Sequence, residues 1–569
     1  MNRIAAILLV SWAALAGSVI ARSPSDLEIA RSSVAAHSAG NLLLEQILLR
    51  RLVIESQSDL ADAASHRLAE SSLESGSYTE TIRLLNSGDG AAEQNSPQCR
   101  RDRALMGEAY RLAGDATTAA RILTEIVATA PNTAQPDDAS LLAVKSLDAM
   151  GRDVDEIEHF RRASVYQFNR YWDEARQHYR LVKTTGDAAE ALVQIGRGYS
   201  QGSEYEKAIP YFQSVIDNYA DSQQAKDALL QTAAAYSRIG RTDEAIARYQ
   251  QYIDKYPTGD KIDRAFLNIV DIDRDLGDDA HALEWCQKTE AAFTGKTPEA
   301  LAIFDEAKIY ASRSEWQNEI AALDRLKGRS DLGGSSQPGG TTSEEVMFMR
   351  GFALEQAGHR AEALKAYEYC PEQTLYTQWA NQRQRQIAPN VQSPCMGLSP
   401  LGAPPFYYIF QDQYYAAIIA RHAAARGIHP MLLFAIMQQE SKFDPQARSN
   451  AAARGLMQFT HPQALKISRE LGWTYFSDDE LYSPEVSIAL AAQYIADLDA
   501  MFPNQPEAVI ASYNGGEDNV TRWMARAKSD DPERYVSEIV YGQTKDYVQK
   551  VMANYRVYQQ SDDAKVPAR

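Results

Sequence analysis

Glu440 is the residue of this 569-residue chain whose surroundings best suit acid–base chemistry. It follows an almost unbroken apolar run, Met431–Met437, which is too apolar for a solvated helix and is therefore predicted to be buried. Burial disfavours a charged carboxylate and raises its pKa. A Glu that keeps its proton near neutral pH is what a general acid needs to cleave a glycosidic bond. A lone Glu in this position is better explained as the exposed end of a core helix, so the interpretation depends on further motifs.

Two such motifs follow at compatible spacing. After Glu440 and Ser441 come Gly455–Gln458 and then Tyr513–Gly516. In this order the three resemble the catalytic domain of soluble lytic transglycosylases, bacterial enzymes that cut the glycan strands of peptidoglycan on a lysozyme-like fold. The resemblance covers roughly residues 405–560. One motif is weak evidence, whereas three in sequence form a specific signal.

The resemblance assigns roles to individual residues. Glu440 is the expected acid. Tyr513 matches a family tyrosine whose phenol can orient the carboxyl group and stabilise developing charge. The expected substrate contacts are Ser441, Ser449, Gly455, Met457, Gln458, Asn514 and Gln543.

Some of these residues have structural explanations as well. Ser441 can equally make a hydrogen bond at a helix end. Met457 offers a soft apolar surface for a sugar face, but it can also pack in a core. Tyr513 can be a core tyrosine whose hydroxyl is satisfied. Gly455, in the segment that resembles the floor of the family's sugar groove, permits a close backbone approach.

The chain shows no convincing second carboxylate. Gln543 stands where the family commonly has Glu, Asp444 is expected to face a loop, and Glu517 is expected to be solvated. The resemblance implies a single-acid mechanism. Glu440 protonates the oxygen that links N-acetylmuramic acid to N-acetylglucosamine, and the muramyl 6-hydroxyl then attacks C1 to give a 1,6-anhydro product. A lysozyme-like hydrolase and a non-catalytic glycan-binding scaffold are the alternatives.

Neither Cys nor His shows metal-ligand spacing, so no metal site is expected. The mechanism that the resemblance implies needs no metal and no organic cofactor. The histidines of the resembling segment are predicted to be structural: His422, His429 and His461. The four cysteines allow three pairings in an oxidising compartment, or four separate thiols. Cys370 and Cys395 bracket a Pro-rich stretch and form the best candidate pair.

The charge and the N-terminus bound the partners and the location. A formal net charge of −18 argues against nucleic acid and against anionic membrane surfaces as partners. Residues 1–21 read as a secretory signal, with Arg3 before the apolar run Ile4–Ile20. We therefore expect a periplasmic protein without a stable membrane span after cleavage; an uncleaved anchor is the alternative.

The middle of the chain repeats itself. Tyr205–Phe212 echoes Thr242–Tyr249, and weaker copies surround this pair. The pattern resembles tetratricopeptide repeats, which pair two antiparallel helices per unit. Residues 22–385 are thus predicted to form an α-helical superhelix. Its concave face can hold a protein partner or a glycan strand, or it can serve only as a scaffold for the catalytic segment.

These observations predict an all-α protein in which a superhelix of degenerate helix pairs precedes a lysozyme-like α domain. Residues 386–405 are expected to be a Pro-rich linker and 406–560 the transglycosylase-like domain. Residues 561–569 are expected to be a disordered tail. The Gly-rich run Gly333–Gly340 is predicted to be a flexible loop. Peptidoglycan glycan strands are the expected substrate.

Overall fold

The computed structural model describes most of the chain: a few residues between Asp26 and Ala36, then 41–56, 59–86, 96–184, 186–334, 337–390, 413–473 and 476–563. The predicted secretory signal, most of the predicted linker and the end of the predicted tail lie outside these residues. Among the described residues, no helix combines the length and the apolar character needed to cross a bilayer.

The chain divides into two compact units, each of which combines repeat helices with part of the C-terminal segment. Unit 1 contains Met1–Ala225 and Glu440–Ala491, and unit 2 contains Lys226–Gln439 and Ala492–Arg569. The predicted superhelix and the predicted catalytic segment are therefore not separate compact bodies, because each unit draws on both.

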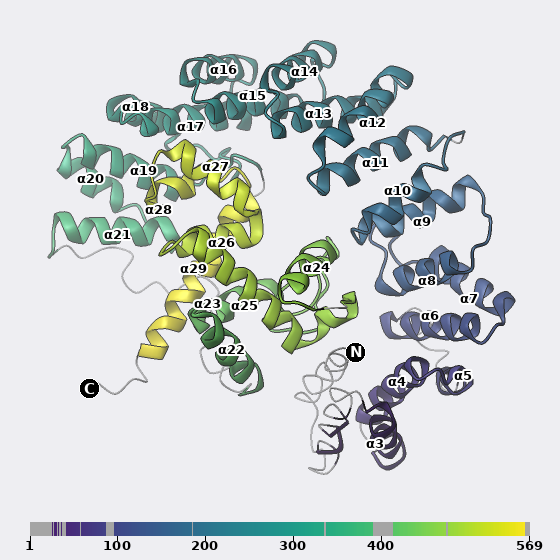
Figure 1. The fold of residues 1–569 in the computed structure, drawn as a ribbon. Coiled ribbons are helices and arrows are strands. Elements are labelled where there is room, and N and C mark those ends of the chain that lie inside the picture. The colour runs from purple at the N-terminus through teal and green to yellow at the C-terminus, as the bar shows by residue number, and fades with distance from the viewer. Residues whose placement is uncertain are drawn as a thin grey trace. The chain divides into compact units, whose positions relative to one another are not determined.

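Helices account for the regular structure of both units, and the described residues form no β-strand (Figure 1). The all-α prediction is confirmed. The helices of unit 1 are α3 (Leu42–Glu55), α4 (Asp59–Glu74), α5 (Tyr78–Asn86), α6 (Pro97–Leu112), α7 (Ala116–Ala128), α8 (Asp138–Ala149), α9 (Glu156–Phe168), α10 (Trp172–Tyr179), α11 (Ala188–Gln201), α12 (Tyr205–Asn218), α24 (His461–Glu470) and the 3-10 helix η5 (Asp478–Tyr482).

Three helices run across the boundaries between the units: α13 (Gln223–Arg238), α23 (Pro430–Ser441) and α25 (Pro484–Met501). The helices of unit 2 are α14 (Thr242–Lys255), α15 (Ile262–Leu276), α16 (Asp279–Ala292), α17 (Thr297–Ser312), α18 (Trp316–Leu326), α19 (Ser343–Gln356), α20 (Arg360–Tyr367), α21 (Leu375–Ile387), α22 (Gln413–Arg426), α26 (Pro506–Gly515), α27 (Glu517–Ala527), α28 (Pro532–Tyr535), η6 (Val536–Glu538) and α29 (Gly542–Asp563).

A small residue on the first helix of a repeat packs against a large residue on the second. A Cβ atom on Gly196 would lie 2.5 Å from the Phe212 ring, and one on Gly351 would lie 2.5 Å from the Tyr367 ring. Both large side chains are fully or almost fully buried. The two helices of each pair therefore approach closely because the first one carries no side chain at the contact.

Glycines in a left-handed conformation lie at the turns inside four of the repeats. Gly114, Gly240, Gly277 and Gly358 have φ values of 91°, 75°, 74° and 85°. This left-handed conformation ends the first helix of each pair and favours glycine. The second helix of each of these repeats has a fully buried alanine at its fourth position, and these alanines are Ala119, Ala245, Ala282 and Ala363. The predicted helix pairs are thereby confirmed.

Two predictions about irregular segments need correction. The described part of the Gly333–Gly340 run, which omits Ser335 and Ser336, is hydrogen-bonded to the C-terminal segment. The Gly339 N–H donates to the Val540 carbonyl at 2.6 Å. Helix α29 continues to Asp563, so the first residues of the predicted tail are helical.

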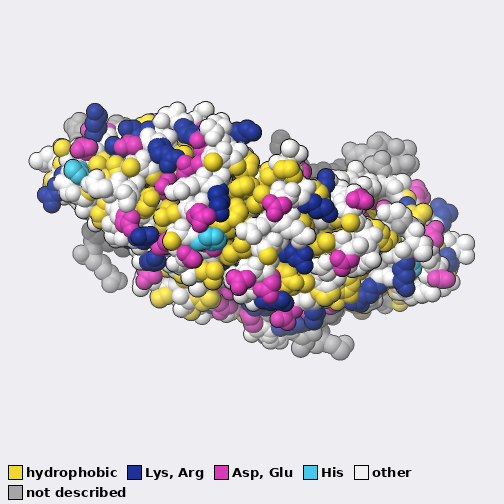
Figure 2. Space-filling view, turned by 90° about the horizontal axis from the view of Figure 1, so that it is seen from above, with side chains coloured by type: hydrophobic (Ala, Val, Ile, Leu, Met, Phe, Trp, Pro, Cys, Tyr) yellow, Lys and Arg dark blue, Asp and Glu magenta, His cyan; other side chains and the backbone are white. Residues whose placement is uncertain are grey.

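Charged side chains of both signs are intermixed on the face shown in Figure 2, without a large area of one sign. The excess of acidic residues is therefore not concentrated there as a single acidic surface.

Candidate active site

Glu440 lies in the last turn of α23, at the end of a buried helix. Pro430 starts this helix, and every residue from Met431 to Met437 is buried. Proline suits a first helical position because the missing N–H has no partner there anyway. Glu440 itself is half-buried, and Ser441 after it is buried. The prediction that the apolar run Met431–Met437 is buried is confirmed.

The backbone turns sharply directly after this helix. Lys442 and Phe443 have φ values of 53° and 67°, a conformation that costs non-glycine residues energy. The Asp444 N–H donates to the Ser441 carbonyl at 3.0 Å, and the Asp444 carboxylate accepts from the Gln446 N–H at 2.8 Å. Asp444 therefore belongs to a loop, as predicted. Strained residues often cluster at functional sites, and here two of them follow the candidate acid.

The next segment, residues 447–459, folds into a compact loop that we call the 447–459 loop. The Gly455 N–H donates to the Ala447 carbonyl at 2.9 Å, and the Arg454 N–H donates to the Phe459 carbonyl at 3.0 Å. Gly455 has φ 75°, and a Cβ atom there would lie 1.8 Å from the Leu481 carbonyl oxygen. The close backbone approach predicted for Gly455 is thus present, and its partner is η5.

Gln458 helps to close this loop with its own side chain. Its Nε2 donates to the carbonyls of Ala447 and Gly455 at 3.0 and 2.8 Å. Its backbone is left-handed, with φ 51°, and its side chain is half-buried. Because the amide nitrogen is engaged with the backbone, the group that Gln458 offers to a ligand is the Oε1 acceptor.

Met457 and Ser449 have structural contacts. The Met457 side chain is fully buried, so it packs in the core, and the expected apolar surface for a sugar is corrected. The Ser449 hydroxyl accepts hydrogen bonds from the N–H groups of Ala451 and Ala453, both at 3.1 Å. Ser449 therefore shapes the loop, and any contact that it makes with a substrate is additional to this role.

Sequence reasoning assigned no contact to Ser487, yet this residue holds the loop. Its hydroxyl accepts the Met457 N–H at 3.1 Å, and its side chain is fully buried on α25. A serine in an apolar helix is the signal that was available, because a buried hydroxyl needs a partner.

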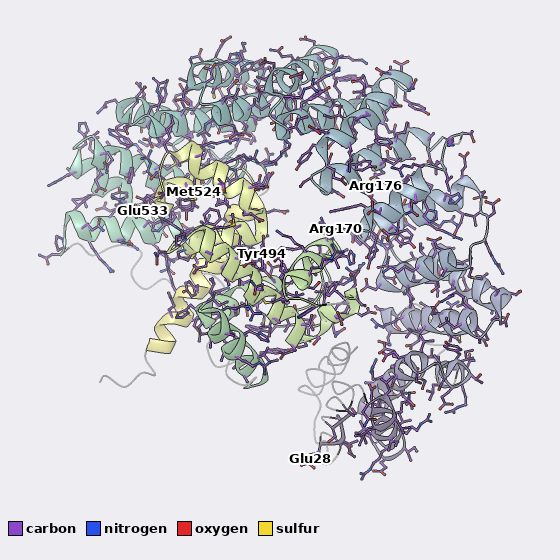
Figure 3. The ribbon with its side chains drawn as sticks, in the orientation of Figure 1. Glu28, Arg170, Arg176, Tyr494, Met524 and Glu533 are labelled. Atoms are coloured by element: carbon purple, nitrogen blue, oxygen red, sulfur yellow. The ribbon has the colours of Figure 1, made fainter. Side chains whose placement is uncertain are left out.

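A second cluster, in unit 2, surrounds Tyr513 on α26. Tyr513 is 9% exposed, and its ring centroid lies 5.5 Å from that of Tyr494 on α25. The Tyr494 hydroxyl donates to Glu517 Oε2 at 3.0 Å; Figure 3 labels Tyr494. Glu517 is half-buried, so the prediction of a solvated side chain is wrong. Tyr494, the tyrosine beside Tyr513, thus hydrogen-bonds the Glu517 carboxylate, which was predicted to be solvated.

Asn514 and Gln543 lie near the same helix end. Asn514 is exposed, and its Oδ1 accepts a hydrogen bond from the Thr544 hydroxyl at 2.7 Å. Thr544 also packs against Gly515, since a Cβ atom there would lie 3.0 Å from the threonine methyl group. Gln543 is exposed at the start of α29. Asn514 thus joins α26 to α29 and keeps its amide nitrogen for other contacts.

A further titratable group lies beside Gly455. Burial raises the pKa of Glu480, in η5, to about 7. Its carboxylate accepts the Ser477 N–H at 3.2 Å and forms the capping box that starts η5. Glu480 precedes Leu481, whose carbonyl approaches Gly455. The capping box that Glu480 forms therefore fixes the start of η5, the 3-10 helix that contacts the 447–459 loop.

The histidine and cysteine predictions have mixed outcomes. His461 is structural: its Nδ1 lies 2.6 Å from Asp478, and its ring stacks on Tyr171 with centroids 4.1 Å apart. Within the described part of the chain, no cluster of His, Cys, Asp or Glu has the arrangement of a metal site. Cys370 is in a disulfide, whereas Cys99 and Cys286 are free thiols. The predicted partner of Cys370, Cys395, lies outside the described residues.

The predicted site residues therefore divide between the two units. Unit 1 carries Glu440, Ser441, Ser449, Gly455, Met457 and Gln458, and unit 2 carries Tyr513, Asn514 and Gln543. Within unit 1 the structure brings Ser449, Gly455 and Gln458 together in one loop. Within unit 2 it places Asn514 beside Thr544, the residue that follows Gln543.

Comparisons with known proteins locate the similarity in this segment. Residues 417–536 match the Transglycosylase SLT domain family, and residues 190–222 and 227–259 match the Tetratricopeptide repeat family. Both predicted resemblances are thus confirmed. The repeat matches cover α11 to α14 and their turns.

Two curated relatives match over the same part of the chain. A putative soluble lytic murein transglycosylase of Haemophilus influenzae is 33% identical over 135 residues, which are 23% of this chain and 23% of that protein. The soluble lytic murein transglycosylase of Escherichia coli is 29% identical over 143 residues, or 24% of this chain and 22% of that protein. The chain thus spans less than a quarter of the length of these relatives.

Among solved structures, the 70 kDa soluble lytic transglycosylase of Escherichia coli aligns with 97% of this chain and 97% of its own, at 15% identity. The TM-score of this alignment is 0.37. This chain therefore combines, in residues 190–259, segments similar to tetratricopeptide repeats with, in residues 417–536, a segment similar to the Transglycosylase SLT domain.

Proposed function

We propose that this protein is a lytic transglycosylase that cleaves the β-1,4 bond between N-acetylmuramic acid and N-acetylglucosamine in peptidoglycan. The observation that carries the proposal is the position of Glu440. It is a half-buried carboxyl group at the end of a buried helix, inside the segment that matches the SLT domain. A carboxyl group at such a boundary can keep a proton and still reach a substrate.

In the proposed reaction Glu440 acts first as an acid and then as a base. Its proton passes to the glycosidic oxygen as the bond from that oxygen to muramyl C1 breaks. The muramyl 6-hydroxyl then attacks C1, and the Glu440 carboxylate takes the hydroxyl proton. The 1,6-anhydro ring forms without water, and Glu440 regains its starting protonation state. The step needs one carboxyl group, because the nucleophile belongs to the substrate.

The other candidate residues support binding in this proposal. Gln458 offers its Oε1 to an N–H or O–H group of a sugar, and Gln543 supplies an exposed amide. For Tyr513 we adopt the role that the family resemblance implies, in which its phenol stabilises developing charge. Ser441 and Asn514 are further proposed contacts, and Gly455 acts through the backbone shape that it permits.

The proposed location is the periplasm, with glycan strands as substrate and the repeat helices available to a protein partner. Residues 1–21 read as a secretory signal, and the matched relatives are named murein transglycosylases. The proposed domain order is the sequence prediction: signal, repeat region to about residue 385, linker, and transglycosylase domain from about residue 406.

Digestion of purified sacculi by the full chain, with mass spectrometry of the released fragments, tests the proposal. A transglycosylase gives 1,6-anhydromuramyl ends, whose mass is lower by one water than that of hydrolysed ends. Hydrolysed ends would identify a lysozyme-like hydrolase. Intact sacculi, together with retained binding to them, would identify a non-catalytic scaffold.

A further inference from the structure

The 447–459 loop is fastened to the repeat helices of unit 1 by one carboxylate, Asp138. This residue is the first of α8. Its Oδ1 accepts from Arg454 Nη2 at 2.7 Å, from Arg454 Nε at 3.1 Å and from Arg448 Nε at 3.1 Å. Its Oδ2 accepts from the Tyr482 hydroxyl at 2.5 Å. One side chain of a repeat helix therefore holds both arginines of the loop and the last residue of η5.

The arginines flank the residues predicted to contact substrate. Arg448 precedes Ser449, and Arg454 precedes Gly455. Asn169, the residue that ends α9, adds a shared acceptor: its Oδ1 lies 3.0 Å from Arg448 Nη2 and 2.7 Å from Arg454 Nη2. We call Asp138, Asn169 and these two arginines the Asp138 anchor.

The Asp138 anchor contains a fully buried positive charge, because Arg454 has no exposed surface. The arginines hold the pKa of Asp138 well below its usual range, so the carboxylate stays charged at neutral pH. A buried guanidinium needs such a partner, since an unpaired charge in the interior is costly. The other acceptors around Arg454 are the Ala452 carbonyl at 2.8 Å and Asp478 at 3.4 Å.

Two further contacts link the repeat helices of unit 1 to residues next to the Asp138 anchor. Arg170, in the turn between α9 and α10, donates through Nε to the Ala451 carbonyl at 3.3 Å (Figure 3). Tyr171 stacks on His461 at the start of α24, and Lys145 lies 3.9 Å from the centre of the Tyr171 ring. The loop and the helix after it are thus both held from the repeat side.

We infer that Asp138 is a positioning residue of the repeat region that sets the shape of the substrate loop, so that the repeats take part in substrate binding. The inference rests on the proposed function. The loop contributes Gln458 and the Gly455 backbone to binding, whereas Glu440 belongs to α23. Loss of the Asp138 charge should therefore weaken substrate binding and leave the chemical step nearly unchanged.

The test compares D138N with D137N in the full chain. Asp137 is the matched control, because it is the neighbouring carboxylate and it also pairs with a buried arginine: Arg100 Nε lies 2.6 Å from its Oδ2. Among the described residues, the hydrogen-bond acceptors of Arg100 all belong to the repeats: Ile126, Thr129, Asp137 and Ser140. D137N therefore reports the cost of weakening the repeats, and D138N adds the loss of the loop anchor.

Steady-state cleavage of soluble glycan strands gives the first readout. For D138N we expect KM to rise by about tenfold with kcat within about twofold of wild type, the pattern of lost uniform binding. For D137N we expect an unchanged KM. Hydrogen exchange gives the second readout: the Arg454 and Gly455 amides, which donate inside the loop, should exchange faster in D138N and not in D137N.

Equal KM values for D138N, D137N and wild type would overturn the inference, as would a fall in kcat alone. If D138N does not fold, R448Q provides the test, because it removes the Arg448 hydrogen bonds to Asp138, Asn169 and the Pro136 carbonyl and leaves the buried pair of Arg454 with Asp138 intact. A KM rise of about threefold is expected for R448Q, and a wild-type KM would contradict the inference. If wild type releases no anhydro fragments, the proposed function fails separately. Glycan binding and loop exchange of D138N then still test the anchor.

Discussion

Lys545 of α29 forms a buried ion pair with Glu345 of α19, with its Nζ at 2.9 and 3.1 Å from the two carboxylate oxygens. Lys545 is 4% exposed and Glu345 is fully buried. The Tyr376 and Thr341 hydroxyls also donate to this carboxylate, at 2.9 and 2.8 Å. A repeat helix and the last helix of the C-terminal segment therefore share one buried charge network within unit 2.

Replacing Lys545 tests how strongly this network holds unit 2 together. K545M leaves the Glu345 charge buried without its cation, which should lower the free energy of unfolding by about 3 kcal/mol. K545M/E345Q removes that charge as well and should recover most of the loss. The measurement is urea unfolding. K550M is the control, because Lys550 pairs with Asp546 at the surface and should cost less than about 1 kcal/mol. A double variant no more stable than K545M would contradict this account.

Glu319 on α18 predicts a pH dependence of stability. It is 2% exposed, and burial raises its pKa to about 8. An unfolded Glu titrates near 4.3, so between about pH 5 and pH 8 the folded state binds a proton that the unfolded state has lost. Stability conferred by the protonated form therefore falls as pH rises through this window.

E319Q removes this titration while it keeps the shape of the side chain. Relative to E319Q, wild type should lose on the order of 3 kcal/mol of unfolding free energy between pH 5 and pH 8.5. Urea unfolding of both proteins across this range measures the difference. A difference that stays constant with pH would show that Glu319 titrates normally.

Gly455 should tolerate no side chain. In G455A the new methyl group meets the Leu481 carbonyl, and the backbone keeps φ 75°, so we expect a loss of about 3 kcal/mol or more and of most activity. G472A is the matched control. Gly472 has φ 72°, but no atom lies within 4 Å of the position of its Cβ, so the cost should be about 1 kcal/mol. Thermal unfolding and sacculus cleavage provide the readouts, and equal losses in the two variants would contradict the close contact.

The tyrosine pair beside Glu517 makes a graded prediction for activity. Y513F should lower kcat by about 10- to 100-fold, because its phenol is proposed to stabilise developing charge. Y494F leaves that phenol in place but removes the hydrogen bond from Tyr494 to Glu517, so a smaller loss of about threefold is expected. Y369F, a change at an exposed tyrosine, serves as the control. The assignment of Tyr513 would be wrong if Y513F matched wild type.

The repeats and the catalytic helices could be predicted because their signals are local. Small residues at fixed spacing, turn glycines such as Gly277 and the apolar run before Glu440 each reflect contacts within one helix pair or one helix. Gly455 was also predictable, since a glycine inside a motif indicates a close backbone approach.

The contacts that join the repeats to the catalytic segment could not be predicted from local patterns. Asp138 and Arg454, or Glu345 and Lys545, lie far apart in the chain, and each looks like an ordinary surface charge in the sequence. Glu517 was misplaced for the same reason, because its partner Tyr494 belongs to another helix. Met457 was ambiguous, since an apolar side chain suits a core and a sugar face equally well.

The most direct test of the central claim compares the cleavage rates of wild type, E440Q and E470Q on purified sacculi, with anhydromuramyl fragments counted by mass spectrometry. Glu470 is an exposed glutamate at the end of α24, so E470Q controls for the loss of a carboxylate in the same segment. We expect E440Q to fold, to bind glycan and to cleave about a thousandfold more slowly than wild type, while E470Q cleaves at the wild-type rate. An E440Q rate within about threefold of wild type would show that the acid is another group.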